Sequence, residues 1–228
     1  MNVWFTSDLH LGHANIAKYC RRPWFKPDMV DGDGNWVSEE IRDACATNMN
    51  AALIQKWNER VKTGDTVFHI GDFCTYGAAN GVPGVKRHAT EWEEILNGQI
   101  IHIRGNHDAN NTVKKHALES AMIRFGGKNV FMMHRPPWDP DSHVEVPGNT
   151  GIILCGHVHE KWACGTHRME SSFSPATGFV PGKTVPVINV GVDVRGFYPM
   201  SKTEVIRGAD SRRHERATDS QSTTGDHR

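Results

Sequence analysis

The sequence lacks any apolar run of the ~18 residues that a membrane-spanning helix needs. Its first residues reach Asp8 too early for a secretory signal peptide, so we expect a cytoplasmic protein with no membrane contact. The five cysteines are odd in number and contain no Cys-x-x-Cys pair. They indicate reduced thiols and exclude both a disulfide framework and a cysteine-based structural zinc site.

The sequence also carries no net charge, because 26 basic residues balance 26 acidic ones. This balance argues against an extended groove that holds nucleic acid by bulk electrostatics. No Gly-x-Ser-x-Gly or phosphate-loop pattern occurs. The 228 residues suffice for one sizeable domain. Residues 208–228 contain almost no apolar side chains. We therefore expect a domain over residues 1–207 and a disordered tail over residues 208–228.

Short apolar runs rich in β-branched residues, bounded by Gly, Pro or Asp, predict strands at 2–7, 66–70, 99–104, 129–133, 151–155, 185–190 and 203–206. An apolar stripe with a four-residue spacing predicts a helix over 38–62, with Ser38 as its N-cap. A capping box from Thr90 to Glu93 predicts a short second helix, and residues 113–122 suggest a third. Segment 22–36 is predicted to be a loop, and segment 160–183 a long, weakly periodic insertion. Strands that alternate with helices indicate an α/β domain.

Histidine is abundant, with 14 residues, and several follow the predicted strands together with Asp, Asn and Gly. Five such blocks occur in order: Asp8-Leu9-His10, Gly71-Asp72, Gly105-Asn106-His107-Asp108, His134 and Gly156-His157-Val158-His159. Each block alone has an ordinary explanation as a turn or a helix cap. Together they place carboxylate, amide and imidazole groups at strand ends, and these are suitable ligands for divalent first-row metals.

The five blocks resemble those of the calcineurin-like metallophosphoesterase superfamily. Residues 189–201 and the segment TSDLHLGHANI are similar to the small members found in bacteria and their phages. The resemblance implies a layered sandwich of two mixed β-sheets flanked by helices, with a dinuclear metal site at the C-terminal ends of the strands. It also implies two ligand sets that share the Asp72 carboxylate: Asp8, His10, Asp72 and His159 for one ion, and Asp72, Asn106, His134 and His157 for the other.

Two divalent ions sharing one carboxylate would attract a phosphate and acidify a bridging water. We favour Mn²⁺, although Fe, Zn²⁺, Ni²⁺ and Co²⁺ accept the same mixed ligands. By resemblance, His107 faces the leaving oxygen as a cation or acid, and Asp108 orients it. Arg135 and His13 are candidates for substrate contact, Arg135 because a guanidinium binds phosphate oxygens bidentately.

The resemblance implies a two-metal phosphoesterase. A short chain without a large cap domain favours a phosphodiesterase that acts on cyclic nucleotides or other small nucleotide esters. A nuclease or a phosphomonoesterase of the same superfamily is the alternative. The block after Gly71-Asp72 contains no Arg, which argues against a Ser/Thr protein phosphatase. A metal-free scaffold that binds protein partners is the alternative from another class, but every ligand position is filled.

Overall fold

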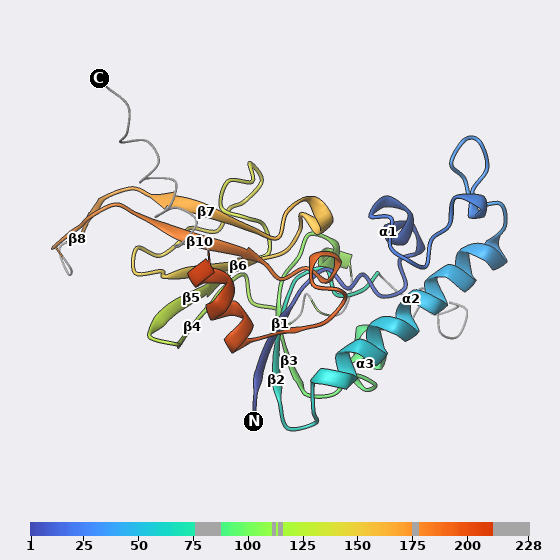
Figure 1. The fold of residues 1–228 in the computed structure, drawn as a ribbon, viewed down its shortest axis with the longest axis horizontal. Coiled ribbons are helices and arrows are strands. Elements are labelled where there is room, and N and C mark those ends of the chain that lie inside the picture. The colour runs from blue at the N-terminus through green and yellow to red at the C-terminus, as the bar shows by residue number, and fades with distance from the viewer. Residues whose placement is uncertain (76–87, 111–112, 114–115, 175–177, 212–228) are drawn as a thin grey trace, which may run out of the picture.

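Two mixed β-sheets stack on one another in this protein (Figure 1). The structure is a computed structural model, and it describes residues 1–75, 88–110, 113, 116–174 and 178–211. The first sheet has the order β11-β1-β2-β3 and comprises β1 (Val3–Thr6), β2 (Thr66–Ile70), β3 (Gln99–Ile103) and β11 (Met200–Ser201). The second has the order β4-β5-β6-β10-β7 and comprises β4 (Ala121–Phe125), β5 (Lys128–Met132), β6 (Ile152–Cys155), β7 (Cys164–Met169) and β10 (Lys183–Asn189). This architecture confirms the predicted fold class.

The central strands of both sheets run parallel, and this fixes where the functional loops lie. β1, β2 and β3 pair in parallel, as do β5, β6 and β10. Residues after parallel strands emerge at the same edge of a sheet. The predicted polar blocks follow β1, β2, β3, β5 and β6, so they are gathered at one end of the sandwich.

Successive residues of a strand point to opposite faces, and the burial follows that rule. Ile152 and Leu154 belong to the core between the two sheets, together with Phe5 and Ile70 of the first sheet. The next residue along, Ile153, lies in a separate cluster on the outer face of the second sheet. Both faces of the second sheet are therefore buried.

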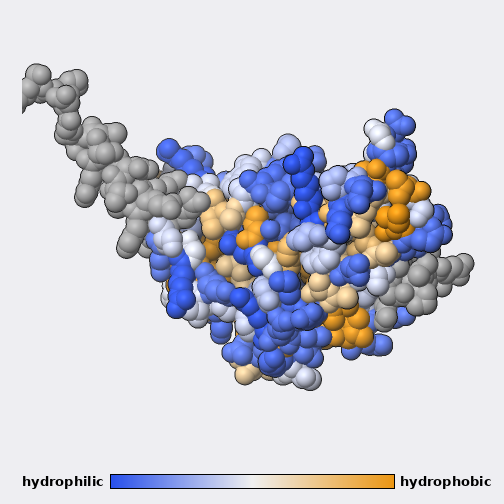
Figure 2. All heavy atoms as spheres, turned by 45° about the vertical axis from the view of Figure 1, so that its right-hand side comes forward, coloured by the Kyte–Doolittle hydropathy of each residue, from blue (hydrophilic) through white to orange (hydrophobic). Residues whose placement is uncertain are grey.

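The long helix α2 (Glu39–Arg60) covers the outer face of the first sheet (Figure 1). Ser38 Oγ accepts a hydrogen bond from the Ile41 N–H at 3.3 Å, which confirms the predicted N-cap. The predicted stripe is buried at Cys45, Met49, Leu53 and Trp57. None of the helices in the described part of the chain is long and apolar enough to span a bilayer. On the face shown in Figure 2 the surface is mostly hydrophilic, with separate apolar patches.

The two shorter helices on this side differ from the prediction. Helix α1 (Ala14–Tyr19) was not predicted. The N-cap of helix α3 (Ala89–Glu93) is His88, two residues before Thr90, the expected N-cap. The His88 N–H donates to Glu91 Oε2 at 2.7 Å, so the reciprocal contact involves Glu91 in place of Glu93. Glu93 is thereby free to face the sheet.

Two further segments correct the sequence-based prediction. Residues 121–122, predicted to end a helix, belong instead to β4, which pairs with β5 across the Gly126-Gly127 turn, where both glycines have positive φ. The segment 160–183, predicted to be a weakly periodic insertion, contains most of the short helix η4 (His159–Lys161), β7, and the paired strands β8 (Ser172–Ser174) and β9 (Gly178–Val180). Polar side chains interrupt the sequence of β7, so it contains no apolar run that would predict a strand.

The C-terminal segment also differs, because residues 202–211 are helical where a strand was predicted at 203–206. The Ser201 N–H donates to Glu204 Oε2 at 2.7 Å and the Glu204 N–H donates to Ser201 Oγ at 3.3 Å, a capping box. Val205 and Ala209, four residues apart, are buried in the core between the sheets. The helix therefore continues to residue 211, past the boundary predicted at residue 208, and residues 212–228 lie outside the described residues.

Two truncations test this boundary. Removal of residues 212–228 is expected to leave the melting temperature unchanged, because their composition offers almost nothing to bury. Removal from residue 208 onward also deletes the buried Ala209 and the Asp210 partner of Lys128, whose atoms lie 2.7 Å apart. A loss of ~1–2 kcal/mol would lower the melting temperature by ~2–8 °C in a chain of this size. Differential scanning fluorimetry of both variants distinguishes the two cases, and equal melting temperatures would place the boundary at residue 208 after all.

Candidate metal centre

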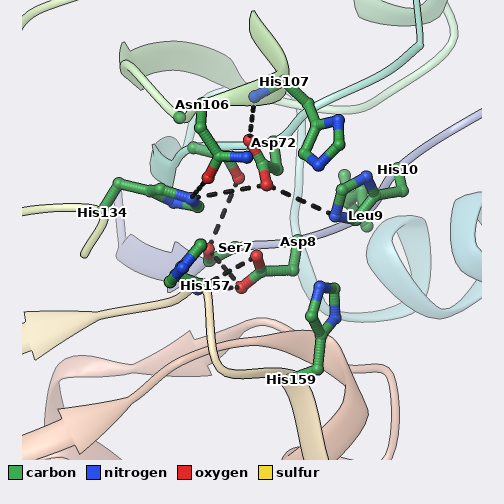
Figure 3. A network of polar contacts seen from close by, with 12 residues as sticks. Ser7, Asp8, Leu9, His10, Asp72, Asn106, His107, His134, His157 and His159 are labelled. Atoms are coloured by element: carbon green, nitrogen blue, oxygen red, sulfur yellow. Dashed lines mark hydrogen bonds and ion pairs between the residues drawn. The ribbon is translucent and has the colours of Figure 1, made fainter. Parts of the chain in front are cut away.

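The seven predicted ligands meet at the carboxyl ends of the parallel strands (Figure 3). They form two groups in which one donor atom from each residue lies within 4.8 Å of the others: Asp8, His10 and His159, and Asp72, His134 and His157. Asp72 Oδ2 lies 3.5 Å from His10 Nε2 and 3.4 Å from His134 Nε2, so it stands between the groups. Asn106 joins the second group, with its Oδ1 3.1 Å from His134 Nε2.

The backbone of these loops is strained at the predicted ligands. Seven described non-glycine residues have positive φ, and five of them are predicted ligands: Asp8 (59°), His10 (51°), Asp72 (59°), His157 (71°) and His159 (48°). A left-handed conformation costs an L-residue ~1–2 kcal/mol. Such strain is kept where the surrounding structure imposes it, and it is concentrated at functional sites. The strain therefore marks these loops independently of their side-chain chemistry.

Two glycines allow the loops to approach this closely. A Cβ atom at Gly105 would overlap the Asp72 carboxylate, and one at Gly156 would overlap Ser7 Oγ. The Ser7 hydroxyl donates to Asp8 Oδ2 at 2.6 Å, and the His157 N–H reaches the same oxygen at 3.0 Å. The Gly156 position therefore lets two loops share the Asp8 carboxylate.

Two carboxylates are buried in the site, and their negative charge favours the binding of positive charge there. Asp8 is 0% and Asp72 1% exposed. Burial raises the pKa of Asp8. Burial alone would also raise the pKa of Asp72, but His134 and His10 beside it lower that pKa overall. Burial opposes protonation of His134, yet Asp72 and Asp8 together raise its pKa to about 9. A positive charge is thus stabilised between these carboxylates.

His10 shows that the residues fit a cation. Its side chain is buried, and neither ring nitrogen makes a hydrogen bond to any residue that the structure describes. Burial lowers the pKa of His10 well below its usual value, so the ring is neutral and a nitrogen lone pair is available. A buried polar atom without a hydrogen bond is costly, and a metal ion bound to the ring would offset that cost. The combined set of imidazole nitrogens, carboxylate oxygens and one amide oxygen suits a pair of divalent first-row ions.

An ion pair that the sequence did not reveal holds one side of the site. Asp193 Oδ2 lies 2.9 Å from His159 Nδ1, and Arg22 binds both Asp193 oxygens at 2.7 and 2.9 Å. Arg22 also donates to the carbonyl oxygens of Asp8 at 2.7 Å and Leu9 at 3.0 Å. A carboxylate on the second nitrogen of a ligand histidine fixes its tautomer and orientation. Arg22 falls in segment 22–36, which the sequence predicts to be a loop. Asp193 falls in segment 189–201, and its similarity to other small members is the only signal in the sequence for this ion pair.

Asp108 joins two loops of the site through backbone hydrogen bonds. Its Oδ2 accepts from the N–H groups of Asp72 at 2.8 Å and Gly105 at 2.9 Å, and its Oδ1 accepts from Phe73 at 3.1 Å. These bonds join the loops after β2 and β3. The carboxylate therefore positions Asp72, and orientation of the His107 ring by Asp108 stays a prediction.

His107 lies at the exposed mouth of the site, in the short helix η2 (His107–Asn110). Its backbone N–H donates to Asp72 Oδ1 at 2.8 Å. Its ring centroid lies 5.1 Å from that of His10 and 6.0 Å from that of His13. His107 and His13 are thus both brought to the rim beside the first ligand group.

Arg135 lies beside the second group. Its Nη1 is 2.9 Å from His157 Nε2, 3.0 Å from Asp139 Oδ1 and 3.5 Å from Asp141 Oδ2. The guanidinium therefore reaches the site, but two carboxylates already offset part of its charge. A cavity of about 160 Å³ adjoins it and extends past His134 to Arg104.

The chain is similar to known proteins over most of its length. Residues 1–191 match the model of the calcineurin-like phosphoesterase superfamily domain. An uncharacterized protein of Methanocaldococcus jannaschii is 29% identical over 205 residues, which cover 90% of this chain and 89% of that protein. The Gene 66 protein of Mycobacterium phage L5 is 28% identical over 193 residues, covering 73% of this chain and 81% of the phage protein.

Among solved structures, a protein of unknown function from Aquifex aeolicus has the same fold. It superposes with a TM-score of 0.54 at 20% sequence identity, and the match covers 90% of this chain and 98% of that one. At this identity the likeness establishes the fold alone.

Proposed function

The chain belongs to the calcineurin-like phosphoesterase superfamily, and we propose that it is a phosphodiesterase using two divalent ions to hydrolyse small nucleotide esters, including cyclic nucleotides. The observation that carries this proposal is the pair of ligand groups on either side of Asp72 Oδ2, at 3.5 Å from His10 Nε2 and 3.4 Å from His134 Nε2. One carboxylate between two nitrogen-rich groups is the arrangement that two neighbouring cations require.

Asp8, His10, Asp72 and His159 would hold one ion, and Asp72, Asn106, His134 and His157 the other. When bound, the two ions supply Lewis-acid stabilisation of charge on the phosphoryl group and activate water as the nucleophile. Mn²⁺ is our favoured ion, since it accepts mixed oxygen and nitrogen ligands.

The chain's own side chains complete the proposed chemistry. Asp193 and Arg22 hold the His159 ring, and Asp108 holds the Asp72 loop. The exposed His107 ring would give a proton to the leaving oxygen, a role in which imidazole is common. Arg135 would bind a phosphoryl oxygen in the cavity that it lines with His134.

The charge around Arg135 favours a diester over a monoester. A diester carries one negative charge, whereas a monoester near neutral pH is close to a dianion. Arg135 is partly neutralised by Asp139 at 3.0 Å and Asp141 at 3.5 Å, so little further cationic charge is available beyond the ions. Trp138, 47% exposed, packs on Trp162 with ring centroids 5.3 Å apart and offers a surface for a nucleobase.

A substrate panel tests this function. With Mn²⁺ present, bis-p-nitrophenyl phosphate is expected to be hydrolysed faster than p-nitrophenyl phosphate, and 2′,3′- or 3′,5′-cyclic nucleotides to be turned over. Exhaustive chelation should abolish all of these activities, and added Mn²⁺ should restore them. Faster hydrolysis of the monoester would contradict the diester preference, and full activity after chelation would contradict the metal-dependent mechanism.

The five cysteines are free thiols, and reduced thiols are typical of the cytoplasm, which is the location we propose.

A further inference from the structure

A second cluster of metal-ligating side chains lies outside the dinuclear centre. It comprises Glu93 at the end of α3, His102 in β3 and His116 in the segment before β4. One donor atom of each residue lies within 4.8 Å of the other two. None of the three belongs to the ligand groups around Asp72.

The distances within this cluster suit a tetrahedral ion. His102 Nε2 lies 2.9 Å and His116 Nε2 3.9 Å from Glu93 Oε1, and the centroids of the two histidine rings are 5.6 Å apart. Ligand atoms around tetrahedral Zn²⁺, with bonds of ~2.0–2.2 Å, lie about 3.3–3.5 Å from each other. The two measured distances lie on either side of that value. Small side-chain rotations would therefore equalise them.

Burial makes one side of the cluster rigid and leaves the other open. The side chain of His102 is 1% exposed, that of Glu93 28% and that of His116 52%. Phe73 packs edge-on against the His102 ring with centroids 4.9 Å apart, which holds the ring in place. The exposed His116 can adjust to an ion, and the open side leaves room for a water as a fourth ligand. Two imidazoles and one carboxylate form a donor set that Zn²⁺ commonly takes.

We infer that Glu93, His102 and His116 bind a third divalent transition-metal ion, with Zn²⁺ as the best match. The ion would join three separate parts of the chain: the end of α3, the β3 edge of the first sheet and the segment leading to β4. Its contribution is structural, since it would fix α3 and the following segment to the edge of the sheet. This inference does not depend on the proposed phosphodiesterase activity.

Metal content tests the inference. The full-length protein and the variants His116→Ala, Glu93→Gln and His167→Ala are equilibrated with Zn²⁺, desalted and measured by inductively coupled plasma mass spectrometry. We expect His116→Ala and Glu93→Gln each to bind one ion per chain fewer than the unmodified protein. His167 lies on β7 and in neither the cluster nor the dinuclear site, so its variant should match the unmodified protein. His116 is half exposed, so its replacement does not endanger the fold.

A second background separates this ion from the dinuclear pair. In Asp72→Asn, which weakens the dinuclear centre, the third ion should remain and should be lost on adding His116→Ala. With Co²⁺ in place of Zn²⁺, the absorption of tetrahedral cobalt should disappear with the same change. Equal metal content in the unmodified protein, His116→Ala and Glu93→Gln would overturn the inference and leave Glu93 and His102 as a hydrogen-bonded pair.

Discussion

Replacement of Asp72 by Asn is expected to abolish turnover and to lower the content of bound metal. The Asp72 carboxylate is 1% exposed and stands between His10 and His134, so both proposed ions depend on its charge. With a neutral amide in its place, two cations would repel each other with less negative charge between them. Loss of a residue that only orients a ligand costs ~10–100-fold. The loss here should be larger, at least ~1,000-fold in kcat with bis-p-nitrophenyl phosphate.

Asp28→Asn is a suitable control for this experiment, because it makes the same change of side chain away from the site. Asp28 is exposed in the short helix η1 (Pro27–Met29) and is in neither ligand group. Its variant should retain both metal ions and stay within a few-fold of the unmodified rate. Normal turnover by Asp72→Asn would contradict the shared-carboxylate arrangement.

The position of the candidate site follows from local features of the sequence. Asp8 comes directly after the apolar run 2–7, and Asp72 is separated from the run 66–70 only by Gly71. The ends of parallel strands meet at one edge. The helix α2 was equally clear, because a long stripe with a four-residue period has no strand interpretation. These features depend on residues close together in the chain, which is why the sequence alone sufficed.

Features that depend on distant contacts were missed. Arg22 and Asp193 are 171 residues apart, and only the folded chain brings them together beside His159.

The run at 203–206 is too short to distinguish strand from helix by its apolar residues. Ser201 and Glu204, which form the capping box there, were the available evidence for a helix.

His107 offers the sharpest test of role, because its replacement should separate catalysis from metal binding. Its contact with Asp72 is made by the backbone N–H at 2.8 Å, which His107→Ala retains. We therefore expect this variant to keep both ions. By contrast, His159→Ala removes a proposed ligand, so metal content and rate should fall together. Inductively coupled plasma mass spectrometry measures the metal in both variants.

The leaving group then distinguishes acid catalysis from phosphate binding. For a diester with an alkoxide leaving group, such as a cyclic nucleotide, loss of the His107 proton donor should lower kcat by ~100- to 10,000-fold. For bis-p-nitrophenyl phosphate the loss should be much smaller, because p-nitrophenolate leaves readily without a proton. Equal losses with both substrates would indicate that His107 binds phosphate. Loss of metal from His107→Ala would mean that the ring itself is a ligand, since the backbone contact to Asp72 is unchanged in that variant.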